Sequence, residues 1–167
     1  MDEHLQRIFV GEIARQCQFA RVAAAGIGAA LNAEDQNGVW YSVQALLVAV
    51  GNISKLLWPK PENQQRGDTL RQLLGVAENS VLASRTFRNR FEHFDEKLED
   101  WAKSSNRRCF IDSNIGLAGR IAGVDIGDYL RNFEPQHGIV TFQGDTYELE
   151  PIIRAVVALH EKALATR

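Results

Sequence analysis

Apolar side chains recur at steps of three and four residues over the first third of the chain, the spacing of helices that bury one face. The pattern predicts one helix from Glu3 to Leu31 and a second from Gln36 to Leu57, separated by polar residues suited to a turn and a new helix cap. The buried positions expected for the first helix are Leu5, Ile8, Phe9, Ile13, Cys17, Ala20 and Ala24. Those expected for the second are Trp40, Val43, Leu47, Val50, Ser54 and Leu57.

The middle of the chain contains a predicted loop and two further predicted helices. Prolines close together after the second helix indicate an exposed loop from Pro59 to Gly67, because proline interrupts a helix. Asp68 is then expected to cap a short helix with the sequence TLRQLLGV. A fourth helix is predicted from Asn79 to Lys103. Its expected core stripe consists of Phe87, Phe91, Phe94, Leu98 and Trp101.

The last third of the chain combines short β-prone segments with a final helix. The segments CFID, GIVTF and TYEL predict a small sheet, and the QGD sequence between the last two predicts a hairpin turn. A short helix is expected around Ile126 to Asn132. Pro151 is expected to begin the last helix, which buries Ile152, Val156, Leu159 and Ala163.

These elements together predict a mainly α fold. It is a helical bundle of about five helices, with a small β-hairpin or three-stranded sheet before the C-terminal helix, in one domain over residues 1–167. A chain that is 45% hydrophobic and 24% charged has the composition of an ordinary folded globule.

Cysteine usage and charge bear on location and partners. Cys17 and Cys109 are far apart, form no CxxC pair and follow no secretory leader, so we expect reduced thiols in a cytoplasmic protein. The most apolar stretch, from Val39 to Val50, is too short to span a bilayer. A net charge of −2 gives no general attraction to polyanions, so nucleic acid would have to bind at a local basic cluster.

The sequence RNRFEHFDE, residues 88–96, places several charged groups around one histidine on the fourth predicted helix. At about 100° per residue, Arg88, Asn89 and His93 all point away from the core stripe, with Asn89 and His93 one turn apart. On spacing alone the commoner interpretation is an exposed, charged helix face. Metal binding by His93, Asp95 and Glu96 is disfavoured, because these positions of a helix do not converge on one ion.

The segment RNRFEH resembles the signature of the HEPN superfamily, in which an arginine and a polar residue precede a histidine by a few positions. The resemblance implies a helical bundle with the motif on a late helix. It also implies a metal-independent endoribonuclease of toxin or antiviral-defence type that acts as a homodimer and needs no cofactor. The expected partners are RNA, a second copy bound through the polar face of the fourth helix, and a cognate antitoxin or regulatory protein.

The resemblance assigns catalytic roles to Arg88, Asn89 and His93. Histidine exchanges protons near neutral pH, and arginine donates two hydrogen bonds to a phosphate. Asn89 is expected to orient the imidazole ring. Because one copy supplies one histidine and the reaction needs both an acid and a base, the site is expected to be shared by two protomers. The basic residues expected to contact RNA are Arg85, Arg90, Arg107 and Arg108.

The regulation and the activity implied by the resemblance both have alternatives. One branch of the superfamily has a tyrosine two positions after the histidine that accepts nucleotide groups, whereas this chain has Asp95 there, which makes that regulation doubtful. A noncatalytic helical interaction module, or an inactive antitoxin or immunity subunit of the same fold, would also fit the pattern. The remaining histidines, His4, His137 and His160, are expected at the surface or at helix caps.

Overall fold

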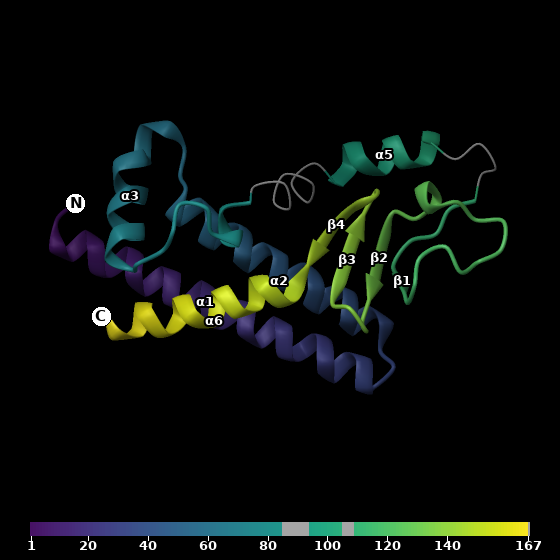
Figure 1. Ribbon diagram of the computed structural model, residues 1–167, viewed down its shortest axis with the longest axis horizontal. Coiled ribbons are helices and arrows are strands. Elements are labelled where there is room, and N and C mark those ends of the chain that lie inside the picture. The colour runs from purple at the N-terminus through teal and green to yellow at the C-terminus, as the bar shows by residue number, and fades with distance from the viewer. Residues whose placement is uncertain (85–93, 105–108, 167) are drawn as a thin grey trace. The chain divides into compact units, whose positions relative to one another are not determined.

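The computed structural model describes residues 1–84, 94–104 and 109–166 (Figure 1). Within these residues the chain forms five α-helices and one four-stranded sheet that comes before the last helix. The predicted mainly α fold class is therefore confirmed. The chain divides into two compact units, residues 1–88 with 151–167, and residues 89–150.

The first unit is built on a helical hairpin of α1 (Glu3–Asn32) and α2 (Gln36–Leu57), whose predicted bounds are confirmed to within a residue. Each helix begins at an aspartate that caps it. The Asp2 side chain accepts a hydrogen bond from the Leu5 N–H at 2.8 Å, and the Asp35 side chain accepts one from the Gly38 N–H at 2.9 Å. These caps satisfy backbone donors that the first turn of a helix leaves without partners.

Burial along α2 follows the prediction, since all six expected positions are buried. The prediction for α1 is correct for Ile13, Cys17 and Ala20 but wrong near the start, where Leu5 is 40% exposed and Ile8 is 53% exposed. Ile8 lies about 180° around the helix from Cys17, so the two cannot share one face. Phe9 and Ala24 are only half-buried, and the other buried positions of α1 are Val10, Ala14, Ala23 and Ile27.

The expected loop from Pro59 to Gly67 is wrong, and so is the expected cap at Asp68. A short 3-10 helix over Pro61–Asn63 leads directly into α3 (Gln64–Leu73), and Asp68 lies inside that helix. Pro61 is tolerated because it occupies the first helical position, where a missing N–H costs nothing. Gly67 is buried, and a Cβ atom there would lie 2.7 Å from the Leu57 carbonyl oxygen, so only glycine lets α3 approach the end of α2 this closely.

Helix α6 (Leu149–Ala165) starts two residues before the predicted Pro151. Its expected buried positions, Ile152, Val156, Leu159 and Ala163, are all buried. In the first unit its C-terminal half is tied to the segment after α3, because Lys162 Nζ donates a hydrogen bond to the Gly75 carbonyl at 2.8 Å.

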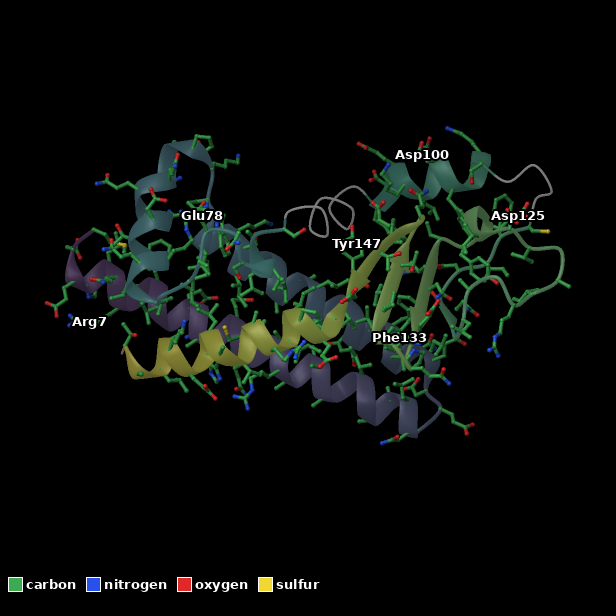
Figure 2. All side chains as sticks on the ribbon, viewed as in Figure 1. Arg7, Glu78, Asp100, Asp125, Phe133 and Tyr147 are labelled. Carbon is green, nitrogen blue, oxygen red and sulfur yellow. The ribbon has the colours of Figure 1, made fainter. Side chains whose placement is uncertain are left out.

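The second unit contains the sheet, with strands in the order β1-β2-β3-β4. Its strands are β1 (Asn114–Ile115), β2 (Arg131–Glu134), β3 (Ile139–Phe142) and β4 (Asp145–Glu148). The first pair is parallel and the other two are antiparallel. Figure 2 shows Phe133 on β2 and Tyr147 on β4. The strands expected at GIVTF and TYEL are confirmed, whereas CFID contributes only a single bridge, between Ile111 and Tyr129.

The short helix expected around Ile126 to Asn132 is wrong, because only Ile126–Asp128 forms a 3-10 turn and the chain then enters β2. Pairing with β3 outweighs the local helical pattern of this segment. The parallel pair is tied by the Asn114 side chain, whose Nδ2 donates to Asn132 Oδ1.

The predicted QGD hairpin turn is confirmed. Phe142 pairs with Asp145, so the turn consists of Gln143 and Gly144, with φ angles of 45° and 83°. Two positive φ angles are the mark of a type I′ turn, whose twist matches that of the strands it joins. The Gln143 side chain also donates a hydrogen bond to the Lys97 carbonyl at 2.7 Å, which ties the turn to the helix α5 (Phe94–Ser104).

The predicted fourth helix is wrong at its start and is described only in part. Residues 79–84 form a turn and a 3-10 helix over Val81–Ala83, and α5 (Phe94–Ser104) is the described helical portion. Phe87 and Phe91 of the expected stripe lie outside the described residues. Leu98 is 41% exposed, and no residue of α5 is fully buried, since the helix lies on one side of a small sheet.

Candidate functional site

The predicted catalytic and RNA-contacting residues lie beside α5 in the chain and outside the described residues. Arg85, Arg88, Asn89, Arg90 and His93 precede α5, and Arg107 and Arg108 follow it. The described residues next to them in the chain are Ser84 and those of α5 and the segment from Cys109.

The described part of α5 starts at Phe94, which follows His93 in the sequence, and Phe94 anchors the helix to the sheet. The Phe94 ring meets the Phe142 ring edge-on, with centroids 6.2 Å apart, and the Arg131 guanidinium lies 5.2 Å from the centre of the Phe94 ring. Further along α5, Trp101 Nε1 donates to the Asp128 carbonyl at 2.9 Å. These contacts fix the orientation of the helix that directly follows the motif.

Asp95 and Glu96 follow Phe94 on α5 and are both exposed. Both are acidic side chains in the first described turn of α5.

Arg131 on β2 is committed to Asp112 and is not free to hold a phosphate. Its Nε donates to Asp112 Oδ1 at 2.7 Å, and its Nη2 donates to Asp112 Oδ2, so the pair is bidentate. Burial raises the pKa of Asp112. The hydrogen bonds and charge of Arg131, together with hydrogen bonds from Ser113, lower the pKa by more than burial raises it, so the pKa of Asp112 lies below the usual 3.8. The Asp112–Arg131 pair therefore joins the segment before β1 to β2.

A depressed carboxylate pKa makes the stability contribution of Asp112 depend on pH. The contribution is present above the unfolded pKa, near 4, and is lost as pH falls through the lower folded pKa. We expect Asp112→Asn to lower the melting temperature at pH 7 by roughly 2–4 °C, corresponding to about 1 kcal/mol. In thermal melts followed by circular dichroism, the difference between the two proteins should shrink below pH 4. A difference unchanged between pH 7 and pH 3 would contradict this assignment.

The structure brings together a second polar group that the sequence pattern did not reveal. His160 on α6 is 7% exposed, so its expected surface or capping position is wrong, whereas His4 and His137 are exposed as expected. Arg21 on α1 lies 2.8 Å from His160 through Nη1 and Nδ1, across 139 positions of the chain. Because a guanidinium only donates, Nδ1 must accept, and the imidazole is neutral with its proton on Nε2.

Cys17 lies one turn before Arg21 on α1 and is fully buried. Burial raises the pKa of its thiol to about 12, although the charge of Arg21 acts in the opposite direction. At neutral pH the group is a thiol, and a thiol is a poor nucleophile. The Arg21–His160 contact therefore joins α1 to α6, and the Cys17 thiol beside Arg21 is not an activated nucleophile.

Two grooves on the surface of the first unit are the largest of those described there. The larger, of about 520 Å³, lies between α1 and α2 and is lined by apolar side chains that include Phe19, Tyr41 and Val48, together with the amides of Gln16, Gln44 and Asn52. We call it the α1–α2 groove. The other, of about 470 Å³, lies between the start of α1 and α3, where Arg66 lies 4.7 Å from the centre of the Phe9 ring. Neither groove contains a histidine or cysteine among its lining residues.

Within the described ranges, no group of three or more histidine, cysteine or acidic side chains is placed to hold a metal ion. Among the described helices, none combines the length and the apolar character needed to cross a bilayer. Comparison with models of known protein families, with curated proteins and with solved structures finds no match.

Proposed function

We propose that the protein is a metal-independent endoribonuclease of the HEPN type, with Arg88, Asn89 and His93 in its active site. The observation that carries the proposal is the motif itself: an arginine and an asparagine stand five and four residues before a histidine, directly ahead of α5. The mainly α fold is consistent with it. A toxin or antiviral-defence role is part of the proposal.

The proposed reaction is an in-line transesterification. The 2′-hydroxyl loses its proton to one His93 and attacks the adjacent phosphorus, forming a 2′-O–P bond. The P–O5′ bond breaks, and the leaving 5′-oxygen takes a proton from the other His93. The products are a 2′,3′-cyclic phosphate and a 5′-hydroxyl, and neither water nor a redox partner is consumed.

The other motif residues act on charge and orientation. Negative charge grows on the nonbridging phosphate oxygens as the transition state forms, and two Arg88 guanidinium groups would stabilise it. Asn89 would hold the His93 imidazole in one orientation through a hydrogen bond. The composite site requires two protomers whose motif-bearing polar faces meet about a twofold axis.

Substrate RNA is proposed to bind through arginine side chains that precede and follow α5 in the sequence. Arg85 and Arg90 precede this helix, and Arg107 and Arg108 follow it. Because the whole chain carries a net charge of −2, such binding would depend on this local cluster and would weaken as salt increases.

The proposal is tested by incubating the purified protein with end-labelled single-stranded RNA in excess EDTA. We expect cleavage at the same rate as without EDTA, with 2′,3′-cyclic phosphate ends, because the histidines and arginines replace a metal ion. The matched control is an oligonucleotide with 2′-deoxyribose throughout, which lacks the attacking hydroxyl and should remain intact. Activity abolished by chelation, or cleavage of the deoxy control, would exclude the mechanism.

A noncatalytic interaction module is the second candidate function, and the α1–α2 groove favours it. Tyr41, 77% exposed, and Phe19, 53% exposed, are large ring systems in contact with solvent at this groove. This candidate predicts no RNA cleavage by the wild-type protein. Expression toxicity that disappears in His93→Ala would support the nuclease and exclude both this module and an inactive antitoxin or immunity subunit.

A further inference from the structure

The groove between the first turns of α1 and α3 combines an apolar side with a guanidinium group, and we call it the α1–α3 groove. Its volume of about 470 Å³ is within the range of small-molecule sites in proteins. Leu5 and Phe9, one turn apart on α1, form its apolar side, and Arg66 lines it from α3. Figure 1 shows α3 beside the N-terminal part of α1.

The Arg66 side chain is held in place by a ring and not by an anion. Its guanidinium carbon lies 4.7 Å from the centre of the Phe9 ring. Its Nε atom is buried, and no described residue accepts a hydrogen bond from it. The two terminal nitrogens also have no hydrogen bond or ion pair with a described residue, and they are not among the buried atoms. Stacking on Phe9 therefore fixes the guanidinium plane and leaves its outer edge open to the groove.

The other inward-facing arginine of α3 shows what Arg66 lacks. Arg71 pairs with the carboxylates of Asp68 and Glu78, so its charge is met within the chain. Glu62 lines the α1–α3 groove one turn before Arg66, but its carboxylate makes no ion pair with the guanidinium. Within the described residues, the carboxylate that would complete the outer edge of Arg66 is therefore missing.

Asn63 brings a second hydrogen-bond donor to the same groove. It occupies the N-cap position of α3, where an asparagine side chain normally accepts a hydrogen bond from the first turn of the helix. Here the side chain makes no capping hydrogen bond, and it lines the groove together with the amide of Gln65. Amide NH₂ groups and a guanidinium are donors, so the polar side of the groove is complementary to a ligand with acceptor oxygens.

We propose that the α1–α3 groove binds a small monocarboxylate that carries a flat apolar group, such as an arylalkanoate. The carboxylate accepts two parallel hydrogen bonds from the terminal nitrogens of Arg66 and a third from the Asn63 amide. The apolar group packs on Leu5, which is 40% exposed. One negative charge suits one guanidinium, whereas a phosphate dianion would meet a single cation next to the carboxylate of Glu62. The site shares no residue with the proposed ribonuclease, so either can fail without the other.

The test is an NMR titration of the isotope-labelled protein with phenylacetate, followed through the Arg66 side-chain Nε–H signal and the backbone amides of α3. These signals should shift and saturate. Phenylacetamide has the same shape without the charge, and it should bind roughly tenfold more weakly because the charge-assisted hydrogen bonds are lost. The absence of saturable shifts, equal binding of the acid and the amide, or tighter binding of inorganic phosphate would overturn the proposal.

Variants locate the site. Arg66→Gln should raise the dissociation constant of phenylacetate roughly tenfold, and Arg66→Lys should restore only part of the binding, because lysine keeps the charge without the planar fork. Glu62→Gln should lower the constant about twofold, because it removes a negative charge beside the bound carboxylate.

Arg15→Gln is the matched control, since Arg15 is an exposed arginine of α1 that pairs with Glu12 outside this groove and should leave the constant unchanged. Circular dichroism melts check that each variant folds. An unchanged constant in a folded Arg66→Gln protein, or the same loss of binding in Arg15→Gln, would also overturn the proposal.

Discussion

Replacement of His93 by alanine is expected to lower the rate of RNA cleavage by roughly 10²–10⁴-fold, the range attributed to a general acid or base. The loss should be at the upper end, because a homodimeric site would lose its acid and its base together. The imidazole is the side chain best matched to proton transfer near neutral pH. Initial rates on end-labelled RNA, at protein concentrations where the wild type and the variant have the same molar mass, measure the effect.

His4→Ala is the matched control for this measurement. His4 is exposed near the start of α1, so its removal should leave both the fold and the cleavage rate unchanged. Full activity in His93→Ala, with a normal melting curve, would remove the proposed function. Equal loss in His4→Ala would point to a general effect on the protein and would also count against the assignment.

Replacement of Arg71 by alanine is expected to have the largest effect on stability among the charged residues in the described part of the chain. Arg71 on α3 is only 8% exposed. Its guanidinium donates to the Leu57 carbonyl at the end of α2 and to the Asp68 carboxylate, and pairs with Glu78 at 2.7 Å. It also lies 5.5 Å from the centre of the Trp58 ring. One side chain thus connects the C-terminal end of α2 to α3 and to the turn that follows.

The expected cost of Arg71→Ala is about 2–3 kcal/mol of the free energy of unfolding, the usual value for hydrogen bonds made by a buried charged group. The cost is not larger because the carboxylates of Asp68 and Glu78 are 51% and 76% exposed and are hydrated once the arginine is removed. Urea titration measures it. Arg7→Ala is the control, since Arg7 pairs with Glu3 at the surface and should cost less than about 0.5 kcal/mol. Equal costs for the two variants would contradict the assigned role of Arg71.

The proposed nuclease residues, Arg88, Asn89 and His93, lie within six consecutive residues, so their proposal needs no knowledge of the fold. The pairing of Arg21 with His160 spans 139 positions and follows no motif. Only the tertiary contact between α1 and α6 brings these two residues together. His160 was expected at the surface because its helix is rich in charges, although its position four residues after the buried Val156 places it on the buried side.

The elements that were predicted wrongly share a physical cause. Around Asn132, local preference favoured a helix, but the segment forms β2 because its backbone groups pair with β3. At Gly67 a loop was expected after the two prolines, yet α3 forms there because a glycine can pack against the Leu57 carbonyl. In both places a contact with another element outweighed the tendency of the local sequence.

The sequence by itself determined the ends and buried faces that depend on near neighbours. Aspartate caps start α1 and α2, the three-and-four spacing selects the buried side of α2 and α6, and Gln143 with Gly144 forms the hairpin turn. These features arise from backbone geometry and hydrogen bonds within a few residues. The tertiary structure alone decided which of the two apolar sides of α1 is buried, how Arg71 joins α2 to α3, and that Tyr41 and Val48 remain exposed. Whether a side chain is buried depends on which distant element packs against it. The order of polar and apolar residues along the chain does not specify that element.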